Sequence, residues 1–587
     1  MPIKVHCVTA FSLQPPNLNL LLGDTGNMIE TTWQNINMLA LSSTQPLLSV
    51  KLGKIKPSSK LQLTYSRSKL PVPKILKDGR SFTLHSTFDP LKEGERYYSS
   101  SPHGGYLLFL GFGAGYHIQP FLKRSDISGI VIIDYGADLF KSLISQLDMR
   151  HFILDKRVRF LIDPQPEDIV KDMLDNYLPA VSGNLYLHQL RSRIELDDKK
   201  FSEAREKITE VLKSISEDYS VQSYFGKRWF INSIENLKIA ENSSTTLNPI
   251  RTALITAAGP SLESQLPELK RQKPSSTLIA TDTSLPFLLK HDLLPDMVIS
   301  IDCQHITYHH FLSGYPEKIP LILDLASPNH LTRRTDRLVF FTSGHPFSKY
   351  VNTVWRKFPY IDTSGGNVSH AAVSLAESLG AQSIYLYGTD FSFPEGKTYA
   401  RGTYLYPYFH SISGRRSSLE NRFFSFLLRN ENIIKVKEDG YLRYTTKPMI
   451  SYKERLEEST ARLSSRVIPM PGKGEHINVF NDNKRKDNSP IIGTVFSAGI
   501  PARPWNDFLH TYRDTLLGLP KAGESLSDYR SKLTKEQKDI VTTLFPAAAA
   551  IRRELEAHGI KKVGINILKE VIEWSTEVID TQLSLFE

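Results

Sequence analysis

The residues best suited to chemistry in this sequence follow predicted strands in the middle of the chain. Residues 253–257 are predicted to form a strand, and Gly259, Pro260 and Ser261 come next, where a helix begins. The free backbone N–H groups and the dipole at a helix N-terminus favour a phosphate. This turn is therefore predicted to bind an anion.

Acidic and glycine residues recur at other strand ends in the same region. Three acids end predicted strands, and a Gly-Gly-Asn run opens another helix; they are Asp282, Asp302 and Asp390, with Gly365, Gly366 and Asn367. Ligands of open α/β sheets bind outside the carboxyl ends of the strands. Each residue has a structural explanation as a cap or turn former, but their recurrence at one sheet edge favours a nucleotide site.

A second glycine-rich turn lies nearer the N-terminus. Gly111, Gly113 and Gly115 separate two apolar runs, and Asp134 ends the second run. This is the Rossmann pattern, in which glycines permit close approach of a ligand and the acid meets ribose hydroxyls. The same glycines also suit a tight turn without a ligand, so both interpretations stay open.

Other motifs narrow the chemistry. Gly396, Lys397 and Thr398 resemble the end of a P-loop, but Phe391 stands where its first glycine belongs, which excludes a Walker A site. No Asp-x-Asp occurs, which disfavours the metal-dependent glycosyltransferases that use it. His305 and His309 lack an obvious third ligand, so no metal site is predicted.

The order of predicted elements indicates a multidomain α/β protein with two Rossmann-like parallel-sheet domains and a C-terminal helical domain. Residues 200–245 are predicted to be helical, and residues 473–490 to form a solvated loop or linker. The predicted divisions are an irregular or β region over 1–100, a Rossmann-like domain over 101–245, a central catalytic domain over 246–475 and a helical domain over 490–587.

Composition limits the partners and the compartment. The net charge of +10, from 72 basic and 62 acidic residues, favours an anionic ligand. Basic residues are scattered and no zinc-finger or RNP-like motif occurs, so nucleic acid is not expected. No run approaches the roughly 18 apolar residues of a membrane helix, and no export signal is seen. Only Cys7 and Cys303 occur, which suggests a reducing compartment; a cytoplasmic protein without membrane insertion is expected.

The motifs together resemble those of the motility accessory factor (Maf) family of flagellin glycosyltransferases. The resemblance rests on residues 258–262, 280–282, 295–298, 365–370 and 384–392, and extends to 86–90 and 110–117. The same core is similar to hydroxymethylpterin pyrophosphokinase-like proteins. The stretches 259–262, 363–365 and 388–391 also resemble bacterial sialyltransferases, so the central domain is expected to be sialyltransferase-like.

The resemblance implies transfer of a nonulosonic acid, of pseudaminic or legionaminic type, from a CMP-sugar donor to Ser or Thr of flagellin, supporting flagellar assembly and motility. It implies no tightly bound cofactor and metal-independent chemistry. Gly259, Pro260 and Ser261 would hold the donor phosphate. The other nucleotide contacts it implies are Asp282, Thr283, Asp302, Thr363, Ser364, Gly365, Gly366 and Asn367.

Catalytic residues follow from the same resemblance. A general base must take the proton of the acceptor hydroxyl, and histidine suits neutral pH. His410 lies downstream of the Gly-x-Asp-Phe strand end, as a histidine does in the sialyltransferases, and Asp390 is the second catalytic candidate. Tyr399, Arg401 and Tyr404 are candidate contacts of the leaving phosphate. Many relatives have histidine where this chain has Tyr399, which leaves the base open.

Two alternatives remain. A pterin pyrophosphokinase would depend on ATP and magnesium. A non-enzymatic flagellar assembly factor would retain the nucleotide fold without its chemistry.

Overall fold

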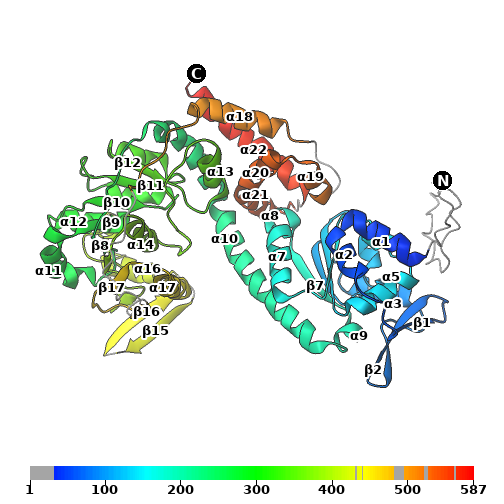
Figure 1. Ribbon diagram of the computed structural model, residues 1–587. Coiled ribbons are helices and arrows are strands. Elements are labelled where there is room, and N and C mark those ends of the chain that lie inside the picture. The colour runs from blue at the N-terminus through cyan, green and yellow to red at the C-terminus, as the bar shows by residue number, and fades with distance from the viewer. Residues whose placement is uncertain are drawn as a thin grey trace. The chain divides into compact units, whose positions relative to one another are not determined.

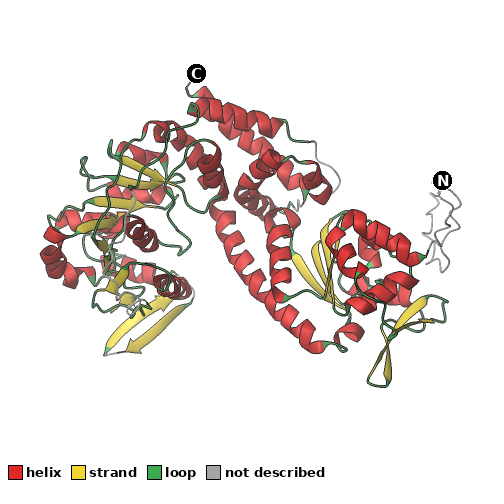
Figure 2. Ribbon diagram, in the orientation of Figure 1, coloured by secondary structure: helices red, strands yellow, loops and turns green. Residues whose placement is uncertain are grey.

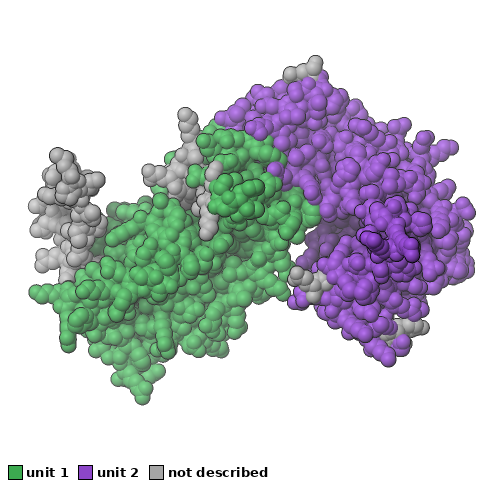
Figure 3. Space-filling model, turned by 180° about the vertical axis from the view of Figure 1, so that it is seen from behind, with its two compact units in different colours: residues 1–226, 518–538, 545–574 green, residues 227–517, 539–544, 575–587 purple. Residues whose placement is uncertain are grey.

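The computed structural model describes residues 32–429, 432–438, 440–480, 495–520, 526–560 and 564–586. The chain separates into two compact units, shown in Figure 3. Unit 1 contains residues 1–226, 518–538 and 545–574, and unit 2 contains residues 227–517, 539–544 and 575–587. The boundary between 226 and 227 falls inside the long helix α10 (Asp198–Asn242), which confirms the helix predicted over 200–245.

Unit 2 is built on a seven-stranded parallel sheet (Figure 1). Its strands are β8 (Thr252–Thr256), β9 (Thr277–Thr281), β10 (Met297–Ser300), β11 (Leu321–Asp324), β12 (Leu338–Phe341), β13 (Ser383–Tyr387) and β17 (Arg466–Pro469). The spatial order is β12-β11-β10-β9-β8-β13-β17, so the order reverses between β8 and β13. The carboxyl ends on either side of this reversal are where ligands of such sheets bind.

Continuous apolar runs explain these strands. Every residue of β10, β11 and β12 is buried, as expected for a parallel sheet covered on both faces. The helices of this part are α11 (Leu262–Gln272), α12 (Leu285–Lys290), α13 (Pro346–Val354), α14 (Val368–Ser378) and α17 (Lys447–Thr460). α14 packs against β8, β9 and β10, and Gly380, with φ 82°, ends it in the left-handed conformation.

An insertion between β13 and β17 was not predicted from the sequence. It contains a three-stranded antiparallel sheet and two short helices: β14 (Phe393–Pro394), β15 (Ile433–Glu438), β16 (Tyr441–Thr446), α15 (Leu405–Ile412) and α16 (Leu419–Leu427). Figure 2 shows β15 and β16 as two long neighbouring strands. Rings of Phe409 and Phe423, with centroids 5.0 Å apart, pack the two helices together.

The segment after β17 differs from the solvated linker that the sequence predicts. Lys473 donates its backbone N–H to Ser261 Oγ at 2.9 Å, and Glu475 donates its N–H to the Asp390 carbonyl at 2.8 Å. Asn478 donates its N–H to Glu457 Oε1 at 2.8 Å. Residues 473–480 are therefore part of the packed unit; residues 481–490 of the predicted linker lie outside the described residues.

Unit 1 contains the second parallel sheet, which confirms two Rossmann-like domains. Its order is β6-β5-β4-β7, with β4 (Gly105–Leu110), β5 (Ile127–Asp134), β6 (Val158–Ile162) and β7 (Leu185–Gln189). The shorter helices around it are α4 (Gln119–Leu122), α5 (Ala137–Gln146), α6 (Arg150–Ile153), α7 (Pro166–Asn176), α8 (Pro179–Ser182) and α9 (Arg191–Ile194).

The region before this sheet contains more helix than the predicted strands and loops. Three strands form an antiparallel sheet: β1 (Leu61–Tyr65), β2 (Pro71–Lys77) and β3 (Arg80–Thr83). Three helices accompany them: α1 (Trp33–Thr44), α2 (Pro46–Gly53) and α3 (Pro90–Ser100). α1 buries a polar residue, Asn37, whose side-chain N–H groups donate to the Ile144 and Leu147 carbonyls. Because one of its buried positions is polar, α1 lacks the simple apolar stripe by which a helix is predicted from sequence.

The C-terminal helices confirm the predicted helical character beyond Pro504. They are α18 (Trp505–Leu517), α19 (Leu526–Lys532), α20 (Lys535–Thr543), α21 (Phe545–Ala557) and α22 (Ile565–Ser584). These helices contribute to both compact units. Across the described part of the chain, no helix combines the length and apolar character needed to cross a membrane.

Candidate active site

Asp282 is the best-defined polar residue at the carboxyl edge of the large sheet. It follows β9 and begins the short 3₁₀ helix η2 (Asp282–Ser284), with 1% of its surface exposed. Its carboxylate accepts hydrogen bonds from Ser300 Oγ at 2.6 Å, and from Thr283 N–H at 2.7 Å and Thr283 Oγ1 at 3.0 Å. Since Ser300 ends β10, these contacts join two strand ends around the buried Asp282 side chain.

Asp302 adds a second carboxylate two residues beyond β10. It accepts the Gln304 N–H at 2.9 Å, just before the 3₁₀ helix η3 (His305–Phe311). Burial raises the pKa of Asp302, and the neighbouring Asp282 charge raises it further, while Arg228 opposes the shift. Two acceptors this close suit hydroxyl or amino donors of a ligand.

His310 and Tyr404 complete this cluster. Their rings meet edge to face with centroids 4.5 Å apart, and the buried Nδ1 of His310 has no hydrogen-bond partner. Burial lowers the pKa of His310, although Asp282 acts in the opposite direction. Burial also raises the pKa of Tyr404 to about 12. At neutral pH the imidazole can therefore accept a proton, and the phenol can donate a hydrogen bond.

Tyr399 belongs to the same group, whereas Arg401 does not. Burial raises the pKa of Tyr399, with Asp282 acting in the same direction and Arg429 opposing. Arg401 donates its backbone N–H to Glu263 Oε1 at 2.9 Å, and its positive charge opposes the rise that burial causes in the pKa of Tyr406. We define the Asp282 cluster by the residues that interact here: Asp282, Ser300, Asp302, His310, Tyr399, Tyr404 and Arg429.

The predicted phosphate-binding turn is engaged by the chain itself. Gly259 donates its N–H to the Gly388 carbonyl at 2.9 Å, and Pro260 has no N–H. Ser261 donates its N–H to Asp390 Oδ2 at 2.8 Å. The Asp390 carboxylate thus lies where the sequence predicts a phosphate, and phosphate binding at this turn stays a prediction.

Asp390 has a positioning role in this arrangement. It is 6% exposed and lies under the segment that follows β17, where a β-carbon at position 474 would overlap it. Burial raises its pKa, while the hydrogen bonds from Ser261 lower it. Its contacts join the ends of β8 and β13, at the reversal of strand order, and its catalytic role stays a prediction.

The predicted cytidine contacts form a separate group at the start of α14. Asn367 caps the helix by accepting the His370 N–H at 3.1 Å, while its own buried Nδ2 has no partner. A β-carbon at Gly365 would overlap the His370 ring, and one at Gly366 would crowd Tyr452 of α17. Thr363 accepts the Gly366 N–H at 3.0 Å through its carbonyl, and Arg455 donates to the Ser364 carbonyl at 3.3 Å.

His410 lies on α15 and is exposed to solvent. Tyr408, on the same helix, has its ring 5.6 Å from that of His309. Two residues further along an α-helix turn the side chain by about 200°, so His410 points to the side of α15 opposite Tyr408. His310 is thus a second candidate for the base, and the catalytic role of His410 stays a prediction.

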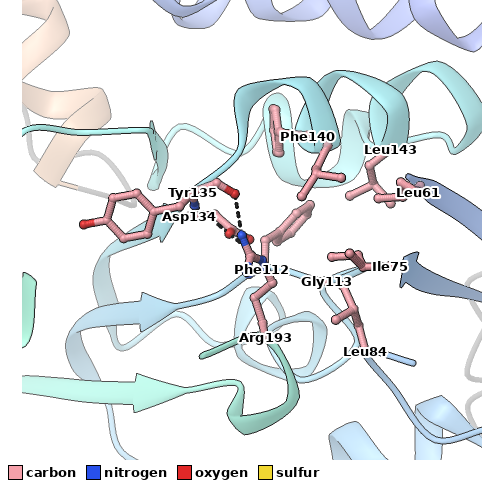
Figure 4. Close-up of a pocket in the computed structure, with 11 residues that line it drawn as sticks. Leu61, Ile75, Leu84, Phe112, Gly113, Asp134, Tyr135, Phe140, Leu143 and Arg193 are labelled. Carbon is pink, nitrogen blue, oxygen red and sulfur yellow. Dashed lines mark hydrogen bonds and ion pairs between the residues drawn. The ribbon is translucent and has the colours of Figure 1, made fainter. Parts of the chain in front are cut away.

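The glycine-rich turn of unit 1 is also filled from within (Figure 4). Asp134 accepts the Phe112 N–H at 2.8 Å and pairs with Arg193 Nε at 2.9 Å. Gly111, Gly113 and Gly115 all have positive φ; a β-carbon at Gly111 would crowd Arg193, and one at Gly113 would overlap His85. The cavity beside this turn measures about 20 Å³, room for about one water. Arg193 therefore occupies the ligand side of the Rossmann pattern.

No group of three or more His, Cys, Asp or Glu suited to a metal ion occurs within the described ranges. His305 and His309 share η3 without a third ligand. Cys303 is a buried free thiol, whose pKa burial raises, and Cys7 lies outside the described residues. The sequence missed His310 as a site residue, although a histidine-rich stretch directly after a strand-ending acid was a usable signal.

Comparison with known proteins finds similarities over the middle of the chain and over the whole fold. Residues 227–396 match the model of the 6-hydroxymethylpterin diphosphokinase MptE-like family. The structure is similar to that of a Maf glycosyltransferase from Magnetospirillum magneticum AMB-1, with a TM-score of 0.56 and 14% identity. The likeness covers 94% of this chain and 96% of the other. The protein is thus a multidomain α/β protein with the Maf glycosyltransferase fold and an MptE-like core.

Two uncharacterized proteins of Treponema pallidum (strain Nichols) are also similar. One is 34% identical over 167 residues, which is 28% of this chain and 80% of the relative. The other is 33% identical over 158 residues, which is 26% of this chain and 55% of that relative. The chain belongs to the same family as the first of these treponemal proteins.

Proposed function

We propose that this protein is a cytoplasmic glycosyltransferase that moves a nonulosonic acid from a CMP-sugar to a Ser or Thr hydroxyl of flagellin. The observation that carries the proposal is the Asp282 cluster, which places two carboxylates, a neutral imidazole and a neutral phenol at the ligand-binding edge of a parallel sheet. The Maf glycosyltransferase fold supports the reaction class.

The roles follow from the chemistry of each group. Asp282, Asp302 and Thr283 accept hydrogen bonds from ribose hydroxyls or a base amino group. Tyr399 and Tyr404 donate hydrogen bonds to the phosphate of the donor. Arg429, which interacts with both tyrosines, balances the negative charge of CMP. No tightly bound cofactor is needed for this step.

His310 is the proton acceptor in the proposed reaction. The acceptor hydroxyl loses its proton to the imidazole as its oxygen bonds to the anomeric carbon of the sugar. The bond between that carbon and the CMP phosphate oxygen breaks, and CMP leaves with the electron pair as a phosphate anion. Positioned bases contribute about 10²–10⁴-fold, which is the loss expected for His310→Gln.

The experiment incubates the protein with purified flagellin and CMP-pseudaminic or CMP-legionaminic acid and measures the mass of flagellin. Wild-type protein should add the mass of the sugar, His310→Gln should be slower by the factor above, and His410→Gln should retain wild-type rates. If no donor adds mass and CMP does not raise the melting temperature, the proposal fails. If His410→Gln alone loses activity, the assignment of the base is wrong.

A second candidate function has one specific observation in its favour, the match of residues 227–396 to the MptE-like family model. It predicts transfer of diphosphate from ATP to a hydroxymethylpterin in the presence of Mg²⁺. Melting temperatures separate the two, because a ligand at 100 times its Kd stabilises by about 2.7 kcal/mol. A shift with CMP favours the first function, and a shift with ATP and Mg²⁺ favours the second.

A further inference from the structure

The insertion that supplies Tyr399 and Tyr404 to the Asp282 cluster also exposes apolar side chains. Tyr408 and Ile412 of α15 are each 42% exposed; Phe424 of α16 is 60% exposed and Leu428, directly after that helix, is 47% exposed. Each pair is spaced four residues apart, so its members lie on one side of their helical segment. The core of the insertion is formed by other rings, such as Phe409 and Phe423.

Positive charge accompanies these exposed side chains. Between residues 397 and 429 the sequence has six basic residues and one acid, Glu420. The basic residues are Lys397, Arg401, Arg415, Arg416, Arg422 and Arg429. All but Arg422 are exposed. We define the insertion surface as the four apolar residues above together with Arg415, Arg416 and Arg429.

This surface continues into the Asp282 cluster. Arg429 lies over the Phe426 ring at 3.8 Å, and the Phe426 ring is 6.2 Å from that of Tyr399. Tyr408 lies 5.6 Å from His309, next to His310. A macromolecule bound to the insertion surface would therefore be held beside the proposed proton acceptor.

We propose that the insertion surface binds an acidic segment of the acceptor polypeptide and presents its hydroxyl to the Asp282 cluster. Exposed aromatic residues and arginines are the side chains enriched at protein interfaces. The excess of positive charge selects a partner segment rich in Asp or Glu. That the partner is the acceptor polypeptide rests on the proposed function. That the surface binds an acidic segment rests on its own exposed side chains and charges.

Binding is measured directly with the full-length protein. A short labelled peptide of alternating glutamate and serine is titrated with the protein, beside a lysine and serine peptide of equal length and phosphatidylserine vesicles. Phe424→Asp and the double change Arg415→Glu with Arg416→Glu should each weaken binding of the acidic peptide by about tenfold or more. Leu517→Asp, at an equally exposed leucine of α18 (60%), should leave it unchanged.

The binding should also weaken as salt rises, since exposed charges are screened within about 10 Å at 0.1 M. Equal affinity for the acidic and basic peptides, or loss of binding in Leu517→Asp alone, overturns the proposal. If the wild type binds the vesicles but not the acidic peptide, and Phe424→Asp abolishes vesicle binding, the insertion surface binds a membrane and the proposal of a peptide-binding surface is overturned.

Kinetics separate this proposal from the proposed function. With flagellin as acceptor, the insertion variants should raise the KM for flagellin and leave the rate of CMP release at saturating flagellin unchanged. Wild-type protein that binds the acidic peptide but never releases CMP would contradict the proposed function and leave the binding surface supported. Normal CMP release with an unchanged KM in both variants would contradict the surface alone.

Discussion

Replacing Arg193 tests whether the Rossmann-like turn of unit 1 is filled from within. The Arg193 side chain is 3% exposed and that of Asp134 is 9% exposed, with Nε and Oδ1 2.9 Å apart. Arg193 also binds Asp197 at 2.6 Å. Removing one partner of a buried pair costs about 3–5 kcal/mol, because the remaining charge is buried without compensation. Arg193→Met should therefore destabilise unit 1 by about this amount.

Hydrogen exchange of peptides covering β4 and β5 measures the effect within unit 1. A loss of about 3–5 kcal/mol speeds exchange through unfolding by roughly 100- to 4,000-fold, while peptides from β9 and β10 serve as the internal reference. Arg191→Met is the matched control. Arg191 forms a pair with Glu195 at the same 2.9 Å distance, but its side chain is 91% exposed, so its loss should cost at most about 1 kcal/mol.

The pH dependence has a defined sign. Burial raises the pKa of Asp134, and Arg193 opposes that rise. In Arg193→Met the pKa of Asp134 in the folded protein rises further above its value in the unfolded chain. Protonated Asp134 therefore limits the loss of stability at pH values below the pKa of the unfolded chain. This protection is lost as the pH rises through the pKa of the folded protein. The defect should be larger at pH 7.5 than at pH 5, and Asp134→Asn should reverse much of it. Equal effects of Arg193→Met and Arg191→Met would refute the reasoning and reopen this turn to a ligand.

Three further predictions concern unit 2. In the wild type, transfer should fall as pH drops through the lowered pKa of His310, and that acid limb should be absent from the residual activity of His310→Gln in a pH–rate profile. Asp390→Ala should lower the free energy of unfolding by about 1–3 kcal/mol, because the buried Ser261 N–H loses its acceptor; urea titration checks this, and an unchanged midpoint contradicts it. Gly365→Ala should lower the free energy of unfolding by about 1–3 kcal/mol, because its β-carbon would overlap the buried His370 ring. Its melting temperature should be lower than that of Gly314→Ala, where a β-carbon meets nothing within 4 Å and only the positive φ adds strain.

The sheets were predictable because parallel strands are continuous apolar runs. Asp282 follows such a run directly and Asp390 lies three residues after one. Asn367 and Gly380 begin and end α14 as their residue types indicate. The insertion was not predictable by the same means, since its helices are short and aromatic on several faces. Residues 473–480 appear polar in sequence, yet their backbone groups bond to Ser261, Asp390 and Glu457.

The site was partly predictable. Strand order brings Asp282 and Asp302 together, because β9 and β10 are neighbours. His410 was selected by its position along the chain, which does not determine the side of α15 on which it lies. His310 lies on a 3₁₀ helix, whose period differs from that of an amphipathic α-helix, so the sequence pattern did not mark it as facing the site.

The contacts of Ser261 also affect how the protein folds. Its N–H bonds to a residue 129 positions later, and its hydroxyl to one 212 positions later. Contacts of such high sequence separation slow folding. At about 5–20 residues per second, synthesis of those 212 residues takes roughly 10–40 s. During that time β8 and its turn are made but lack these partners, so unit 2 can be completed only after Lys473 has left the ribosome. A chain truncated before Lys473 should therefore expose the first turn of its central sheet and depend on chaperones.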